Sequence, residues 1–193
     1  PKAKNAHYYC FLAAYYLKDY DDSEQHAAAY ARAGAPAFAD VLRAVSASDR
    51  VQIAEMILFL GNRAYTAKRI ENSRDLNHVI ACLKDSADAW NNHAYLCRET
   101  KQFKSAYSSY QHAIEKEPTS AQLWNDAAVV LQYHLPTAKN LAKARTMYEQ
   151  SLQLATKTLA DKSISEQQRT FAEEAQVNAR ANIAELDKLS KGK

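Results

Sequence analysis

The chain has little of the material from which sheets, tight turns and disulfide frameworks are built. Its 193 residues include 3 glycines, 4 prolines and 3 cysteines. So few glycines and prolines leave little scope for hairpins or long loops, whereas alanine, leucine, glutamine, lysine and glutamate, which favour helix, are abundant. We therefore expect an all-α protein.

Charge of one sign and long apolar runs are also lacking. The 25 basic and 22 acidic residues are interspersed and give a net charge of +3. This balance disfavours nucleic acid or an anionic membrane as an obligatory partner, and only residues 188–193 are locally basic. No apolar run approaches the roughly 20 residues of a membrane span. The chain begins at Pro1 and not at Met, so we expect a processed or cloned fragment from which a targeting segment could have been cut away, and we assign no compartment.

Metal and catalytic signatures are missing as well. The cysteines Cys10, Cys82 and Cys97 are odd in number, have no metal-type spacing and lie in apolar helical patterns, so we expect buried free thiols. Cys97 follows His93 by one helical turn, which could form a nucleophile–base pair, but both positions are expected to be buried. The six histidines show no metal-type spacing, and the sequence contains no glycine-rich phosphate loop. We therefore expect no metal site and no cofactor.

Two tryptophans, Trp90 and Trp124, lie 34 residues apart, and each opens a copy of one pattern. The copies read Trp-Asn-Asn-His-Ala and Trp-Asn-Asp-Ala-Ala. A fixed period of this size is typical of stacked helical repeats, whose units cannot bury their apolar faces alone. The spacing therefore predicts a helical-repeat protein.

Residues 87–152 resemble the tetratricopeptide repeat (TPR). In the first copy a small residue follows the tryptophan, a small-x3-aromatic-x2-small rhythm occupies the second helix, and a proline closes the unit. The matching residues are Trp90, Ala94, Ala106, Tyr110, Ala113 and Pro118. His93 and Cys97 depart from this pattern, because leucine and tyrosine are usual at their positions. The small residues allow the two helices to pack closely, and the aromatic residue fills the space between them.

The second copy repeats the tryptophan and the small residue as Trp124 and Ala128. Its second-helix rhythm is Ala144-x3-Tyr148-x2-Ser151, which comes 38 residues after its counterpart. Four residues are therefore inserted around 135–140, and we expect them to lengthen the loop between the two helices. This copy has no closing proline.

The resemblance implies a right-handed α-solenoid of antiparallel helix hairpins, which we expect to form a single domain. Outside 87–152 the repeat pattern is degenerate. The expected organisation is 1–46 as degenerate N-terminal helices, 47–86 as a degenerate repeat, 87–120 as a TPR, 121–158 as a TPR with the insertion, and 163–189 as a capping helix. Capping signals predict helix starts at Asp21-x-x-Glu24, Ser46-x-x-Asp49, Thr119-x-x-Gln122 and Ser163-x-x-Glu166. Gly34 and Pro36 predict a break between two helices.

The resemblance also implies a concave groove lined by the first helix of each repeat. Asn91, Asn92 and Asn125 are the strongest candidates for ligand contact, because an amide can both donate to and accept from a peptide backbone. The alternative is an ordinary solvated polar face. Binding of a C-terminal carboxylate would need positively charged side chains at the positions of Gln122 and Asp126. This class of ligand is therefore disfavoured, since Asp126 would repel a carboxylate. The full lining would be Asp88, Asn91, Asn92, Tyr95, Arg98, Glu99, Gln122, Asn125, Asp126, Val129, Gln132 and Tyr133.

The first helix is unusually rich in tyrosine, with Tyr8, Tyr9, Tyr15 and Tyr16 on several faces. Aromatic residues at helical spacing are as consistent with packing inside the array as with a surface that meets a partner. In the second case this helix is the candidate contact for a homo-oligomer.

These observations predict a non-catalytic scaffold that binds a peptide or a helix of a partner protein in the groove. One alternative is an accessory or regulatory domain of a larger enzyme or complex. Another is a helical-repeat nucleic-acid binder, for which Arg63, Arg69, Arg74 and Arg98 and base-stacking tyrosines argue. The low net charge and the acids in the inferred groove argue against nucleic acid.

Overall fold

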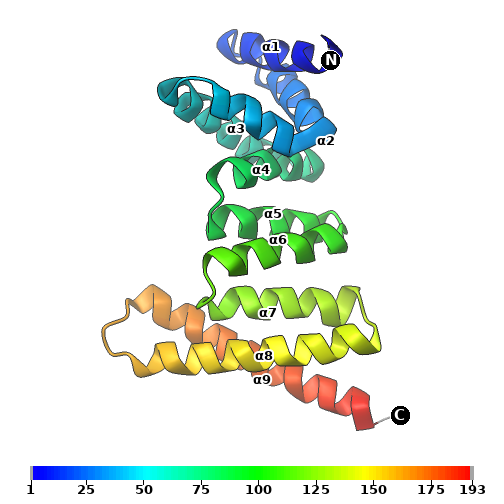
Figure 1. Cartoon of the computed structure of the whole chain (residues 1–193), viewed down its shortest axis with the longest axis vertical. Coiled ribbons are helices and arrows are strands. Elements are labelled where there is room, and N and C mark those ends of the chain that lie inside the picture. Colours follow the sequence, from blue (N-terminus) through cyan, green and yellow to red (C-terminus); the bar gives the residue numbers. More distant parts are fainter. Residues whose placement is uncertain (1, 192–193) are drawn as a thin grey trace. The chain divides into compact units, whose positions relative to one another are not determined.

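The computed structural model describes residues 2–191 of the chain and the side chains of residues 6–189. Throughout this part the secondary structure is helical, so the prediction of an all-α protein is confirmed (Figure 1). The chain falls into two compact units, Pro1–Lys101 and Gln102–Lys193. The boundary lies inside the predicted repeat 87–120, between its two helices.

The first unit contains five helices. Helix α2 packs against α1, α3 and α4, and α4 also packs against α3 and α5. Their shared core consists mainly of aliphatic and aromatic side chains, among them Phe11, Phe38, Leu42, Ile57 and Leu60. The helices are α1 (Lys2–Tyr16), α2 (Tyr20–Ala44), α3 (Ala47–Thr66), α4 (Ile70–Lys84) and α5 (Ala87–Glu99).

Helix α2 combines two helices that the sequence predicts as separate. Gly34 has a non-helical backbone, with φ 162° and ψ 85°, and it marks a kink between the two halves. Pro36 is tolerated directly after this kink because the first turn of a helix does not need its missing N–H group. The predicted break is therefore present as a kink.

Helices α3 and α4 approach closely at Gly61. A Cβ atom at this position would lie 3.3 Å from Asn77 Nδ2 and 3.6 Å from Leu76 Cβ. A small residue is thus needed at the contact between these helices, as the repeat pattern expects of a first helix facing its second.

The second unit is built around α8. Helix α8 packs against α7 and α9, and α7 also packs against α6 and α9. The rhythm residues Ala144, Tyr148 and Ser151 are buried, and the Ser151 hydroxyl donates to the Ala121 carbonyl at 2.7 Å. The elements are α6 (Phe103–Lys116), α7 (Ala121–Val129), a π-helical turn η1 (Val130–His134), α8 (Ala138–Ala160) and α9 (Glu166–Lys191).

The four inserted residues do not lengthen a loop, so that expectation is wrong. The connection 100–102 after α5 and the connection 135–137 after η1 are equally short. One extra residue is absorbed by η1, where the Leu135 N–H donates to the Val130 carbonyl at 3.1 Å, across five residues. The other three extend the start of α8 ahead of Ala144. Both solutions keep backbone groups hydrogen-bonded within helices, which a longer loop would not.

Two of the predicted caps are displaced toward the C-terminus. Helix α7 begins after Ser120 and not after Thr119, and no side chain caps it. Before α9 a reciprocal capping box joins Ser165 and Gln168, two residues later than predicted, with bonds of 2.9 and 3.2 Å.

The two caps of the first unit also differ from each other. Helix α2 begins after Asp19, two residues before the predicted start, and the Asp19 carboxylate accepts from the Asp22 N–H at 3.2 Å. The cap at Ser46 is confirmed, since its hydroxyl accepts from the Asp49 N–H at 3.2 Å. Local capping patterns thus locate these helix starts to within about one turn.

The cysteines are free, but they are not all buried. Cys97 is buried, Cys82 is half-buried and Cys10 is exposed on α1. The expectation of burial is therefore wrong for Cys10, which follows Tyr9 on the solvent side of the helix. None of the described helices is long and apolar enough to cross a membrane.

Candidate functional site

A continuous polar stripe runs along the exposed face of α5. Asp88, Asn92, Tyr95 and Glu99 recur at intervals of three or four residues and are exposed. Asn91 and Arg98 lie at the edge of the stripe and are half-buried. The sequence-predicted lining of the first repeat is thus on one helix face. Among the described residues, neither the Asn91 nor the Asn92 amide forms a hydrogen bond.

Tyr95 connects this stripe to helix α3. Its hydroxyl lies 3.3 Å from the hydroxyl of Tyr65 in the last turn of α3. The hydrogen bond to Tyr65, together with partial burial, raises the pKa of Tyr95 to about 12. Both phenols are partly exposed, and they add aromatic surface and hydrogen-bonding hydroxyls to this part of the molecule.

The opposite face of α5 is anchored in the interior. The buried His93 ring stacks on His78, with 4.2 Å between ring centroids. Burial, with His78 and Arg74 nearby, lowers the pKa of His93 to about 3, so the imidazole is neutral at pH 7. The Trp90 indole N–H donates to Asp85 at 2.9 Å. These contacts fix the rotation of α5 and hence the direction of the polar stripe.

Cys97 and His93 are in contact, but the Cys97 thiol does not have the properties of a nucleophile. Cys97 Sγ lies 3.3 Å from His93 Nε2. Burial raises the pKa of Cys97 to about 11, so the thiol stays protonated. A catalytic cysteine instead needs a thiolate in a partly exposed, electropositive setting. The pair therefore acts as packing.

The predicted lining of the second repeat is arranged differently. Asp126 and Val129 are half-buried and Tyr133 is exposed, whereas Asn125 and Gln132 are buried. The capping helix α9 packs against α7, and the Tyr133 hydroxyl donates to Asn182 of α9 at 3.1 Å. Asn125 and Gln132 therefore do not lie on a solvated groove surface. The sequence did not indicate that α9 would pack on this side.

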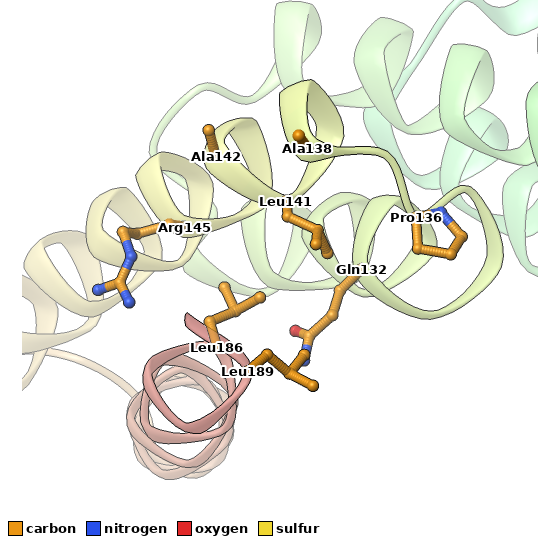
Figure 2. A pocket seen from close by; sticks show the side chains of 8 residues that line it. All are labelled: Gln132, Pro136, Ala138, Leu141, Ala142, Arg145, Leu186 and Leu189. Atoms are coloured by element: carbon orange, nitrogen blue, oxygen red, sulfur yellow. The ribbon is translucent and has the colours of Figure 1, made fainter. Parts of the chain in front are cut away.

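A cavity that sequence reasoning missed lies beside Gln132 in the second unit. It has a volume of about 580 Å³ and is bounded by η1 and the residues after it, the start of α8 and the end of α9 (Figure 2). Its lining residues are Gln132, Pro136, Ala138, Leu141, Ala142, Arg145, Leu186 and Leu189. The insertion that the sequence places around 135–140 was the only sequence signal near this cavity.

The tyrosines of α1 divide into two pairs. Tyr8 packs against Phe38, with 6.1 Å between centroids, and Tyr15 packs against Phe59 at 6.1 Å. Tyr9 and Tyr16, seven residues apart, are exposed. Packing within the array thus accounts for the first pair, and only the second can meet a partner.

Metal-binding side chains do not converge in the described part of the chain, where no group of three or more histidine, cysteine, aspartate or glutamate residues could hold an ion. The Nδ1 atoms of His7 and His26 lie 2.9 Å apart, and Asp22 Oδ1 lies 3.6 Å from His26 Nε2. This arrangement is a local helix–helix contact.

Comparison with known proteins identifies similarities of fold. No protein-family model and no curated protein matches the chain. Among solved structures, a chain from a T3SS complex of Aeromonas hydrophila is similar, with a TM-score of 0.57 and 17% identity over 76% of this chain and 89% of that one. The Sgt2 TPR domain from Aspergillus fumigatus has a TM-score of 0.48 at 14% identity over 70% and 82%, and MamA has 0.46 at 14% over 96% and 92%. These last two similarities are too weak to support an inference.

The chain has a TPR-like helical-repeat fold. The two tryptophan-led copies and the buried rhythm residues of α6 and α8 carry the repeat pattern, and the T3SS chain is similar in its fold. At this level of identity the similarity concerns the fold alone, because function is a property of sites on a fold.

Proposed function

We propose that the protein is a non-catalytic interaction scaffold and that the exposed face of α5 binds an extended peptide of a partner protein. The observation that carries the proposal is the pair Asn91 and Asn92, whose amides form no hydrogen bond with the described residues and which precede Tyr95 by about one helical turn. An amide can donate to a peptide carbonyl and accept from a peptide N–H group, so two in succession suit a backbone running along the helix.

The chemistry of α5 favours a peptide over other ligands. Asp88 and Glu99 border the stripe and repel phosphate, which disfavours nucleic acid. The tyrosine hydroxyl and ring give contact area with few rotatable bonds, as is common in protein-binding surfaces. The buried, neutral His93 and Cys97 on the other face provide rigidity.

Selection from a random peptide library tests the proposal even though the partner is unidentified. Peptides that bind the intact protein are measured against Asn92→Ala and Tyr95→Ala, with Glu71→Ala on α4 as an exposed control. We expect Asn92→Ala to weaken binding about tenfold, the effect of a well-placed interfacial hydrogen bond, and the control to change nothing. Peptides that bind both variants as tightly as the unchanged protein would place the site elsewhere.

Self-association through α1 is a second candidate, favoured by the exposed Tyr9 and Tyr16 of this helix and by the exposed Leu17 directly after it. Solvent-facing aromatic and aliphatic groups on one helix are typical of surfaces that meet a partner. Light scattering would detect a dimer, which Tyr9→Ser with Tyr16→Ser should convert to a monomer. A monomer at high concentration of the unchanged protein would exclude this role.

A further inference from the structure

The cavity beside η1 is largely apolar. Leu141 of α8 and Leu186 and Leu189 of α9 line it together with Pro136 (Figure 2). Its volume of about 580 Å³ lies within the range of small-ligand sites, roughly 300–1,000 Å³. The space is large enough for one apolar side chain and the adjoining backbone.

One polar group in this lining has no hydrogen bond. Gln132 is only 4% exposed, and neither its Nε2 nor its Oε1 has a hydrogen-bond partner among the residues that the structure describes. In Figure 2 its side chain extends from η1 toward Leu186 and Leu189. A buried amide without partners is destabilising, and buried polar groups in native proteins are nearly always hydrogen-bonded. The position of Gln132 therefore calls for a group that is not in the free chain.

The backbone around Gln132 points the same way. Gln132 lies in the π-helical turn η1, which accommodates one residue more than an α-helix. Such turns are rare and occur often at functional sites. The first repeat reaches its connection without a π-turn, so η1 and its amide are local additions to the repeat pattern.

The charges at the rim are already paired. Arg145 donates to Asp187 of α9 and lies 3.9 Å from Glu149 on its own helix. Because its guanidinium is neutralised by these carboxylates, the cavity offers no free charge to an ionic ligand. The occupant should therefore be neutral.

We propose that this cavity binds a segment of a partner protein, with one aliphatic or aromatic side chain inserted among Leu141, Leu186 and Leu189. The peptide group next to that side chain bonds Gln132, with its N–H donating to Oε1 and a carbonyl accepting from Nε2. A peptide backbone supplies both partners at once, whereas a lipid hydrocarbon supplies neither. Leu189, which is 52% exposed near the end of α9, moves aside to admit the backbone.

This site is separate from the α5 surface, and it shares with the function proposed above only the class of ligand. The two are tested independently, because the cavity residues belong to α8, α9 and η1 with the residues after it, and the peptide-library variants are on α5. Loss of one site leaves the measurement of the other unchanged.

Nuclear magnetic resonance on the whole labelled chain tests the site with N-acetyl-L-leucine N-methylamide, which carries one apolar side chain between two peptide groups. We expect saturable shifts of the Gln132 side-chain NH2 signals and of the Leu141, Leu186 and Leu189 methyl signals, with a dissociation constant on the order of 1 mM for so small a probe. No saturable shift at tens of times that concentration would overturn the proposal.

Three variants define what the probe recognises. Gln132→Leu keeps the size of the side chain but removes the amide, and it should weaken binding about tenfold or more. Ala142→Phe places a ring in the cavity from the exposed side of α8 and should abolish binding, while Lys139→Phe, one turn earlier and outside the lining, should not. Equal binding by Gln132→Leu would mean simple apolar adsorption, which would also overturn the proposal.

Discussion

The two units contain contrasting examples of buried polar side chains. In the first unit the carboxylate of Glu24 is fully buried on α2, yet it is bonded on both oxygens. In the second unit the amide of Gln132 and the hydroxyl of Tyr148 are buried without a hydrogen-bond partner in the described part of the chain. Both units are helical arrays of similar size, so the difference lies in what each interior polar group is for.

The first unit shows how a buried charge is satisfied. Arg69, directly before α4, donates to both oxygens of Glu24, at 2.7 and 2.6 Å, and Asn72 of α4 donates to one of them at 2.9 Å. A second carboxylate, Asp75, accepts hydrogen bonds from the guanidinium groups of Arg32 at 2.8 Å and Arg74 at 2.6 Å. The bonds made by Arg69, Asn72 and Arg32 join α2 to α4 and its N-terminal cap across more than forty residues of sequence, so polar groups here fix the register of the helices.

Several buried polar groups of the second unit lack such partners. Asn125 Oδ1, the Gln132 amide and the Tyr148 hydroxyl form no hydrogen bond with the described residues, and burial raises the pKa of the Tyr148 hydroxyl above its ordinary range. A buried polar group whose hydrogen-bond partners are present thus contributes to the fold. Where partners are missing, the group either destabilises the fold or serves a ligand.

The largest expected effect comes from breaking the satisfied network. Glu24→Ala should lower the free energy of unfolding by about 3–5 kcal/mol, because it leaves Arg69 and Asn72 without their buried acceptor. Chemical denaturation measures the change. Asp21→Ala removes an exposed carboxylate that contacts the same Arg69 and Arg63 and should have a much smaller effect. Equal effects would mean that burial of Glu24 is unimportant.

Acid should destabilise the first unit through His93. The pKa of His93 is lowered to about 3 in the folded chain, and an unfolded histidine has a pKa of about 6.5, so the unfolded state binds more protons between these values. Stability should therefore be full above pH 6.5 and fall as pH drops, by about 2 kcal/mol between pH 7 and pH 5. His93→Leu, which restores the usual repeat residue, should flatten this part of the profile. An unchanged profile in that variant would assign the titration to another group.

Removing the unsatisfied amide should act in the opposite direction from Glu24→Ala. Gln132→Leu is expected to raise the free energy of unfolding by about 1–2 kcal/mol, because it replaces a buried group without hydrogen bonds by an apolar one of similar size. Thermal and urea unfolding would show this gain. Tyr148→Phe should be neutral or slightly stabilising for the same reason. A loss of stability in both variants would show that hidden partners exist for these groups.

The smallest effect is expected on the exposed stripe. Asn91→Ala should change the free energy of unfolding by about 0.5 kcal/mol or less, because the side chain is half-buried and bonds nothing in the free protein. The substitution should nevertheless weaken the binding of the peptides selected on α5. Unfolding of the chain by this substitution would show that the stripe belongs to the interior.

Helix content and repeat phase could be predicted from the sequence because they are local. The Trp90 and Trp124 copies, the rhythm around Tyr110 and Tyr148, and the cap at Ser46 all depend on residues within one or two turns. The polar stripe of α5 follows from the same periodicity once the buried positions Ala94 and Cys97 are assigned. These features survive in the structure with few changes.

The candidate site of the second repeat could not be predicted in the same way. Asn125 has the position and chemistry of a groove residue, and only its burial shows otherwise. Likewise, the four-residue insertion could have formed a longer loop or a π-turn with a longer α8. The choice depends on backbone hydrogen bonds and on contacts with helices distant in sequence.

The sequence by itself determined that this protein is a set of helices in a TPR-like repeat, because helix periodicity and capping act over a few neighbouring residues. Only the tertiary structure decided which polar residues would be satisfied. Glu24 meets Arg69, forty-five residues away, and Gln132 comes to lie beside Leu186 with no partner for its amide. Solvation and hydrogen-bond partners of a side chain are set by whatever packs against it, and that neighbour is rarely close in sequence.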